Sequence, residues 1–409
     1  MAAIPIEHAL AETLPLTADE RKWGFGDVSA VHTGLAIATW GFLVGGATAQ
    51  MLGFWDGVLA ILLASVIGIG ILQTALVLPA VKWGTENFVY HRVAYGAWGA
   101  LLLTVMTAGI MAPFWSAILS SMAAAAYVEM TSDGAVFLQN LDAPVVSLVI
   151  LALSFLLVVR GSRSVRIVNL IAAPALVGLC VCLFVALFTR VSPAELAAAE
   201  PLAPGGDRAT RIMLAVELNI AGAFSWHGLA ANLGRFASSQ RAAVWGGFTG
   251  LVLANALACS IGLASALTLA SGDPVSWMKP LVGPWGGILL LLVLMLANLS
   301  SIVAMIEGNC MTVLQNLGPH VQRLGFAGAA ALLLGIAAVI TVTATEAFYS
   351  QFYLVQSYVQ SILVGAIGVM LADRLILRRD LVVIASLYDA KPDGRYRFWG
   401  GLNPFPSRR

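Results

Sequence analysis

The chain has 409 residues, of which 59% are hydrophobic and only 11% are charged, with a net charge of +1. Soluble domains carry about 25% charged residues, so this composition excludes a soluble enzyme, a disordered chain, a disulfide scaffold and a nucleic-acid-binding protein. The mean hydropathy of +0.88 and the long, continuous apolar runs instead indicate a helical protein that crosses a lipid bilayer several times.

Ten apolar stretches follow a mixed polar segment, residues 1–27. A helix needs roughly 20 residues to cross a bilayer, and only the fourth stretch is clearly shorter. In chain order we predict membrane spans at Val28–Leu52, Gly57–Leu78, Trp98–Tyr127, Pro144–Val159, Ile167–Phe188, Ile212–Ala231, Ala242–Ala270, Trp285–Glu307, Phe326–Thr345 and Phe352–Leu375.

Basic residues indicate the orientation of these spans, because cytoplasmic loops carry an excess of Lys and Arg. With the N-terminus inside, four of the 22 basic residues fall outside and the other 18 are cytoplasmic. The four are Arg190, Arg208, Arg211 and Lys279. The asymmetry supports a multi-pass protein of the cell membrane with ten spans and both termini in the cytoplasm.

A long outer loop, residues 190–211, divides the spans into two groups of five. Because five is odd, the second group, residues 212–377, is inverted relative to the first, residues 28–189. A tail, residues 378–409, remains in the cytoplasm. Inverted repeats of this kind are typical of secondary transporters, which bind substrate near the bilayer midplane where helices are interrupted.

The first span of each group has an unusual centre. Residues 37–41 and 222–228 each combine glycine with a hydroxyl and a tryptophan at mid-depth. Glycine weakens a helix and lets backbone carbonyls turn toward a ligand, although membrane helices also use glycine for packing. We predict an interruption in each span, with four substrate-binding residues: Thr39, Trp40, Ser225 and Trp226.

Spans three and eight also carry polar or helix-breaking residues near their centres. Pro113 interrupts the hydrogen bonds of span three next to two candidate substrate-binding aromatics, Phe114 and Trp115. Span eight carries Asn298, Ser300 and Ser301, and a hard cation such as Na⁺ prefers oxygen ligands of this kind. The alternative is that the serines bond to their own backbone.

Three ionisable side chains lie within the predicted spans: Glu217, His227 and Glu307. Charge in a bilayer is costly, so each is a candidate for contact with substrate or a coupling proton. Glu307 could instead lie at the inner interface, and Glu217 could face an outer vestibule. We assign His227 and Glu307 to the candidate substrate site. No span carries a paired-carboxylate, Ser/His or metal-ligand arrangement at mid-depth, which argues against an intramembrane enzyme.

Taken together, these segments resemble the nucleobase–cation symporter-1 family, which contains permeases for cytosine, purines, allantoin and hydantoins. The resemblance covers nearly the whole chain, and it depends on the order and spacing of many short motifs. They are Leu14-Pro15, Glu20-Arg21, Trp23, Trp40-Gly41-Phe42, Gly45-Gly46, Lys82-Trp83-Gly84, Arg92, Tyr95-Gly96, Trp98-Gly99, Asn169, Pro174, Ser225-Trp226, Asn232, Arg235-Phe236-Ala237, Asp373-Arg374, Leu377-Arg378-Arg379, Leu387-Tyr388-Asp389 and Gly400-Gly401-Leu402-Asn403.

The resemblance implies an all-α, five-plus-five inverted repeat of the LeuT type and symport of a planar heterocycle with Na⁺ or H⁺, without another cofactor. It implies that two tryptophans, Trp115 and Trp226, stack on the substrate. It also implies a sodium site formed by carbonyls of span one and an Ala-x-x-Ser-Thr pattern of span eight. Its counterparts here are Ala38, Gly41, Ala297, Ser300 and Ser301.

Several residues depart from the family pattern. The tryptophan of span three is displaced by about one turn, the family's aspartate in span six is Asn232, and Glu307 lies beside the position of the family's asparagine. These changes imply that the substrate is hydrogen-bonded differently from the family pattern. Glu307 is then a candidate to supply the hydrogen bonds that the missing residues would have made. Members usually carry two further spans, so a ten-span core is expected. The alternatives are a carrier of the same fold for an amino acid or vitamin, and a truncated paralogue that does not transport; the sequence indicates no particular oligomer.

Overall fold

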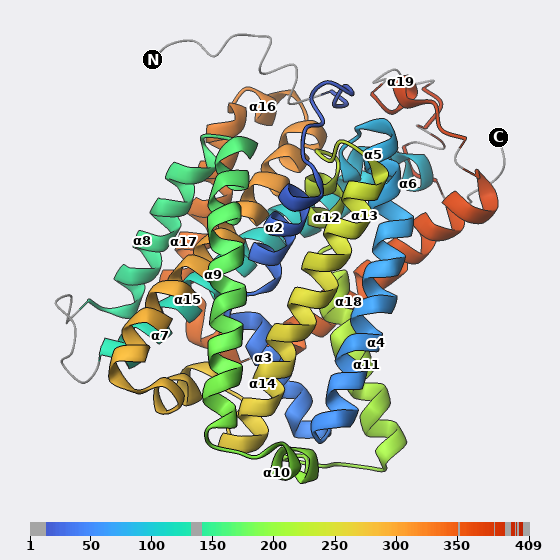
Figure 1. Ribbon diagram of the computed structural model, residues 1–409. Helices are drawn as coiled ribbons and strands as arrows, with labels where there is room; N and C mark the ends of the chain where they lie inside the picture. The colour runs from blue at the N-terminus through green and yellow to red at the C-terminus, as the bar shows by residue number, and fades with distance from the viewer. Residues whose placement is uncertain are drawn as a thin grey trace.

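The computed structural model describes residues 14–131, 141–350, 352–379, 381–388, 394–396, 398 and 401–403. The chain is a bundle of helices (Figure 1). Its first half contains α2 (Phe25–Ala36), α3 (Thr39–Met51), α4 (Phe54–Leu72), the π-helix η1 (Gln73–Val77), α5 (Leu78–Trp83), α6 (Asn87–Thr104), the π-helix η2 (Val105–Met111), α7 (Ala112–Thr131), α8 (Ala143–Val158), α9 (Ser162–Phe188) and α10 (Pro193–Ala198).

The second half begins with two helices that are bent relative to each other, as the first half does. It contains α11 (Arg208–Phe224), α12 (His227–Gly234), α13 (Gln240–Gly247), the π-helix η3 (Phe248–Ala254), α14 (Asn255–Leu269), α15 (Pro274–Asn316), α16 (Pro319–Gln322), α17 (Gly325–Ser350), α18 (Phe352–Ala372), the π-helix η4 (Asp373–Leu377) and α19 (Ile384–Leu387). Each of the ten predicted spans overlaps one of these helices or a run of them, although the bounds differ.

Many of these helices have the length and apolar character of membrane spans. Within the described residues, six are long and apolar enough to cross a bilayer, and two bent helix pairs pass the same test together. Large apolar side chains lie on the outside of the bundle, among them Leu102, Ile171 and Val339, each about 60% exposed. An apolar exterior over an apolar interior is the arrangement of a multi-pass membrane protein.

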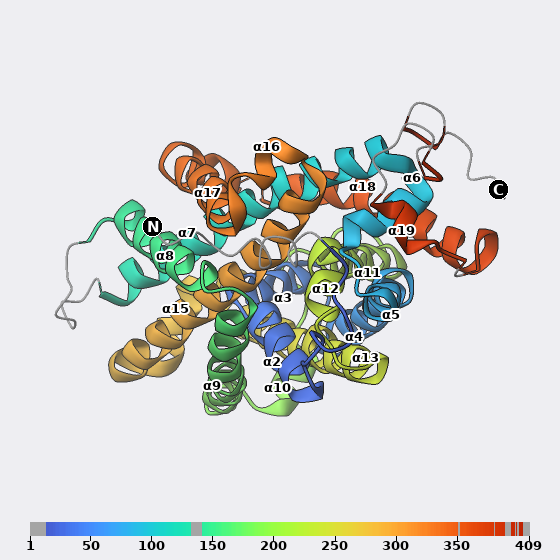
Figure 2. The same ribbon diagram turned by 90° about the horizontal axis from the view of Figure 1, so that it is seen from above.

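The predicted interruptions of spans one and six are confirmed. Helix α2 ends at Ala36, and Ile37 and Ala38 have extended backbone angles before α3 starts with a bend of 58°. Helix α11 ends at Phe224, and α12 starts after Ser225 and Trp226 with a bend of 44°. Viewed from above, α2, α3 and α12 lie in the interior of the bundle, with other helices around them (Figure 2).

Glycines allow α3 to lie directly against α14. A Cβ atom on Gly45 would lie 2.0 Å from the carbonyl oxygen of Cys259, and one on Gly262 would lie 2.1 Å from that of Phe42. Only glycine permits such a close approach of two backbones, and small residues serve this purpose in membrane helices. The predicted packing role of glycine therefore applies here, whereas the break itself falls at Ile37 and Ala38.

An additional helical segment precedes the predicted start of span three. Helix α6 begins at Asn87 and changes direction at Gly96, whose backbone φ is +75°. A side chain at Gly96 would also collide with the carbonyl of Gly401, which accepts a hydrogen bond from the amide of Trp98. The first turns of α6 are therefore a separate helical segment that hydropathy assigned to a polar loop.

The two ends of the bundle differ in what they contain. One end holds α5, α16 and α19, and the opposite end holds α10 (Figure 1). We call them the α16 end and the α10 end. Leu16 bonds to Gly84 beside α5, and Asn403 bonds to the backbone of α6. Both ends of the described chain are therefore fastened at the α16 end, as an even number of spans requires.

Candidate substrate and ion site

Three tryptophans from different spans meet beside the two interruptions. The ring centroid of Trp40 lies 6.2 Å from that of Trp115 and 5.4 Å from that of Trp226, and both contacts are edge to face. Trp40 lies in the first turn of α3, Trp226 precedes α12, and Trp115 lies in the first turn of α7. The breaks position two of these rings because each ring sits at the end of a half-helix.

A small cavity of about 30 Å³ lies among the tryptophan rings. Of the predicted substrate residues, Trp40, Trp115, Ser225 and Trp226 line it. So does the predicted sodium ligand Ser301. Sequence reasoning missed the apolar residues that complete the wall, which are Leu35, Leu119, Leu229 and Met305. They carried no signal, because apolar residues occur throughout the spans.

The other predicted substrate residues do not line this cavity. The hydroxyl of Thr39 accepts a hydrogen bond of 2.8 Å from the amide of Asn298. Phe114 is buried, with its ring 6.4 Å from that of Trp115. Glu307 is completely buried in α15 and is not among the residues that line the cavity. These three residues therefore do not form the surface of the small cavity.

His227 points away from the tryptophans. Its Nε2 lies 2.9 Å from Nε2 of His91, and both rings are fully buried. His91 lies in the first turns of α6, the segment that the sequence analysis placed in a loop. The structure therefore associates His227 with a second histidine instead of with the small cavity.

The two serines of α15 bond to the last turn of α2. The hydroxyl of Ser301 donates to the carbonyls of Gly34 and Leu35, at 3.0 and 3.1 Å. The hydroxyl of Ser300 donates to Gly34 and to the carbonyl of Ala297, at 3.2 and 3.0 Å. The predicted residues Ala297, Ser300 and Ser301 are thus brought together with span one.

The carbonyls that meet these serines lie about one turn before those expected. The last carbonyls of a helix have no amide partner within it, which leaves those of Gly34 and Leu35 available. The carbonyl of Ala38 instead accepts the amide of Gly41, at 3.0 Å. A Cβ atom on Gly41 would lie 3.2 Å from that of Ala258 in α14, so this glycine packs against a helix.

A buried carboxylate that sequence reasoning missed lies between α6, α12 and α15. Glu86 accepts hydrogen bonds from Asn232, Thr312 and Asn316, at 2.9, 2.7 and 3.0 Å, and from the amide of Val89. Four hydrogen-bond donors around one carboxylate offset the free-energy cost of burying its charge. Asn232, the departure from the family's aspartate, is therefore a partner of Glu86 and does not line the small cavity.

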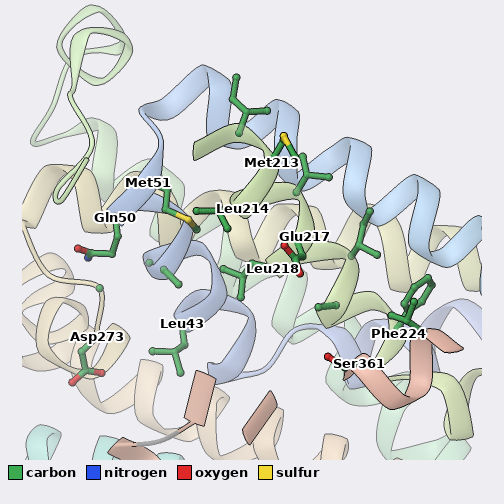
Figure 3. Close-up of a pocket in the computed structure, with 18 residues that line it drawn as sticks. Leu43, Gln50, Met51, Met213, Leu214, Glu217, Leu218, Phe224, Asp273 and Ser361 are labelled. Carbon is green, nitrogen blue, oxygen red and sulfur yellow. The ribbon is translucent and has the colours of Figure 1, made fainter. Parts of the chain in front are cut away.

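A large cavity of about 1230 Å³ lies between α3, α11 and α18, on the α10 side of the tryptophans. Figure 3 shows its lining, with Glu217 and Leu218 on α11, Leu43 on α3, and Ser361 on α18. Glu217 is exposed in it, as expected if this residue faces a vestibule.

Comparison with known proteins identifies the family and the fold. A family model described as a permease for cytosine/purines, uracil, thiamine and allantoin matches residues 15–405. A search of curated proteins gives no significant match. The fold is similar to Mhp1, a nucleobase-cation-symport-1 family transporter. The closed conformation of Mhp1 with bromovinylhydantoin bound is 20% identical, with a TM-score of 0.80 over 96% of this chain and 86% of that one.

Two further similarities define the fold class. The inward-facing conformation of Mhp1 is 21% identical, with a TM-score of 0.79 over 96% of this chain and 85% of that one. A Na⁺-coupled sialic acid symporter in an outward-open state is 12% identical, with a TM-score of 0.65 over 90% of this chain and 82% of that one. The LeuT-type fold predicted from the sequence is confirmed. With its sequence matched from residue 15 to residue 405, the chain belongs to the family of permeases for cytosine/purines, uracil, thiamine and allantoin, and it is a membrane carrier rather than an enzyme.

Proposed function

We propose that this carrier imports a nucleobase-like heterocycle, of the purine, pyrimidine, allantoin or hydantoin type, by symport with a cation. In this proposal it lies in the cell membrane with both termini in the cytoplasm, and it alternates between outward- and inward-open states. The observation that carries the proposal is the cluster of Trp40, Trp115 and Trp226 at the two interruptions.

Aromatic rings suit a planar heterocycle, because such a molecule offers a π-face to stack on while its edge forms hydrogen bonds. The cavity of about 30 Å³ is too small for a heterocycle, so a ring must move to admit one. Trp40 is the ring between the other two, since it contacts both. A shift of Trp40 with α3 would open space between Trp115 and Trp226, where the substrate would then be stacked.

The oxygen atoms around Ser300 and Ser301 support a sodium site. The carbonyls of Gly34, Leu35 and Ala297 lie within hydrogen-bond distance of the two hydroxyls. Hard cations prefer oxygen ligands of this kind. In this proposal Na⁺ enters between α2 and α15 and replaces the serine hydrogen bonds with ion–oxygen contacts, so that the position of α2 depends on the ion.

A thermal-shift screen of the purified carrier tests the substrate class, because a bound ligand raises apparent stability. The screen uses uracil, cytosine, allantoin, a hydantoin, thiamine and leucine, with and without Na⁺, and is followed by uptake into proteoliposomes. We expect a heterocycle to stabilise the protein and leucine to have no effect. Stabilisation by leucine alone would indicate an amino-acid carrier, and binding without accumulation would indicate a paralogue that does not transport.

Trp226→Ala tests the stacking site directly. Loss of one stacked ring costs about 1–3 kcal/mol, so the dissociation constant of the heterocycle should rise roughly 10- to 100-fold. Trp245→Ala is the matched control, because Trp245 is 60% exposed on the outside of the bundle and should leave binding unchanged. Equal affinities for both variants would rule out Trp226 as a binding residue.

A further inference from the structure

Two buried histidines form a hydrogen-bonded pair between α6 and α12. The distance from Nε2 of His91 to Nε2 of His227 is 2.9 Å, and the ring centroids are 4.8 Å apart at 80°. His91 Nδ1 lies 2.6 Å from the carbonyl oxygen of Asn87. The proposed transport mechanism uses neither ring.

The hydrogen bonds determine where the protons are in the neutral pair. A carbonyl oxygen only accepts, so His91 Nδ1 carries a hydrogen and donates to Asn87. His91 Nε2 is then a lone pair, and His227 Nε2 must carry the hydrogen that is shared between the rings. His227 Nδ1 is therefore a lone pair, and it is buried without a hydrogen-bond partner among the described residues.

We propose that His91 and His227 form a proton-binding site in which His227 Nδ1 takes up one proton, and that this proton holds α12 against α6 during cation-coupled transport. The second part rests on the function proposed above. The proton adds to the free lone pair of His227, and the bond between the rings remains in place. A second proton would place two N–H groups 2.9 Å apart, so the pair binds only one.

The protonated pair would fasten α12 more firmly. The backbone amide of Asn87 already donates to the side-chain oxygen of Asn232 at 2.8 Å. The side-chain amide of Asn87 donates to the carbonyl of His227 at 2.9 Å. Protonation converts the bond between the rings into a charge-assisted one, and such bonds are roughly twice as strong as neutral ones. Helix α12 directly follows Trp226. Protonation of the histidine pair would therefore couple the α16 end of the bundle to the tryptophan site.

The surroundings of the pair can accommodate one positive charge. Phe88 stacks on His91 at 5.1 Å and contacts His227 edge to face at 5.4 Å, and Tyr95 stacks on His91 at 6.1 Å. Aromatic faces attract cations. The titratable or charged residues on the elements packed against the pair include Glu86 just before α6, Tyr90, Arg92 and Tyr95 on α6, Arg235 after α12, Glu307 and Cys310 on α15, Lys82 on α5, Asp27 and His32 on α2, Arg241 on α13, and Tyr388 after α19.

The test follows the nitrogen atoms of histidine directly. The chain contains five histidines, so ¹⁵N-histidine labelling of the full protein in nanodiscs gives few signals to assign. At about pH 8 we expect the Nδ1–H tautomer for His91 and the Nε2–H tautomer for His227. On acidification to about pH 4, His227 Nδ1 should take up a proton while His91 Nε2 stays unprotonated. The absence of titration at His227 Nδ1, or protonation of His91 Nε2 first, would overturn the proposal.

A second measurement tests the link to α12. Spin labels at Ser238→Cys, just after α12, and Arg163→Cys, at the start of α9, report the distance between these exposed positions in a Cys182→Ser background. We expect that distance to depend on pH in the parent protein and in the exposed control His320→Gln. The dependence should be lost in His227→Gln and in His91→Gln, and its retention in both would refute the link. Neither measurement requires a transported solute. A lack of uptake would therefore refute the proposed function but not the proton-binding site.

Discussion

The two interrupted spans satisfy their broken backbones in different ways. After α2, the carbonyls of Gly34 and Leu35 are met by hydroxyls from another helix, at Ser300 and Ser301. After α11, the chain satisfies itself, because the amide of Ser225 bonds to Ala221 and Gly222, and that of Trp226 bonds to Ala223. The first break therefore brings together oxygen atoms from two helices. At the second break, the backbone hydrogen bonds stay within the same segment of chain.

This difference separates the roles of the two breaks. A cation at the first break would replace contacts between α2 and α15, so its presence would affect how these helices lie. At the second break no such exchange is available, and α12 is instead held from beyond the break by Glu86, Asn87 and His91. We therefore expect the first break to respond to the ion and the second to the contacts of α12.

The largest effect should come from Glu86→Ala. This substitution removes the carboxylate that accepts from Asn232, Thr312 and Asn316, and leaves these donors only their weaker acceptors within α15. Breaking a buried charged network of this kind costs about 3–5 kcal/mol. The midpoint of thermal denaturation of the purified protein should fall by several degrees, and α12 should lose one of its contacts with the start of α6.

The matched control is Glu217→Ala, because Glu217 is exposed in the large cavity. An exposed substitution of this kind changes stability by about 0.5 kcal/mol or less. Equal denaturation midpoints for the two variants would mean that Glu86 does not stabilise the α16 end.

The positions of the spans could be predicted because apolar length is a property of local sequence. The breaks were also predictable, since glycine, hydroxyl and tryptophan residues cluster at 37–41 and 222–228. Glu86 and His91 were not. Both lie next to charged and polar residues that read as a loop, and only the packing of α6 against α12 and α15 buries them. Burial that depends on tertiary contact leaves no local pattern.

A double variant, Ser300→Ala with Ser301→Ala, should have an intermediate effect that is specific to the ion. It removes both hydroxyls that face the end of α2, so a sodium ion would lose two of its oxygen ligands. We expect the Na⁺ concentration needed for half-maximal stabilisation or uptake to rise about tenfold or more, which corresponds to about 1.4 kcal/mol.

Thr343→Val is the control for the double variant, because the exposed Thr343 hydroxyl bonds only within its own helix, to Val339. If the double variant kept the sodium response of the parent protein, the ion would not bind at the first break.

The register of this site shows where sequence reasoning fails. The family resemblance implied the carbonyls of Ala38 and Gly41, whereas the carbonyls that meet the two serines are set by where α2 ends. Ile37 still donates its amide to Thr33, so the chain leaves the helix late and exposes the carbonyls of Gly34 and Leu35 on the side of α15. One residue more or less of helix would present different oxygen atoms, and hydropathy does not resolve such a difference.

The smallest effect should come from Ser225→Ala at the second break. The Ser225 hydroxyl already donates to the carbonyl of Gly222 at 2.6 Å, so toward a substrate it can only accept. Loss of one such bond costs about 0.5–1.5 kcal/mol, and the dissociation constant of the heterocycle should rise roughly two- to tenfold. Ser225→Thr should restore binding, since threonine keeps the hydroxyl. A loss larger than that of Trp226→Ala would show that polar contacts, and not stacking, dominate at the second break, and the contrast between the two breaks would then have to be redrawn.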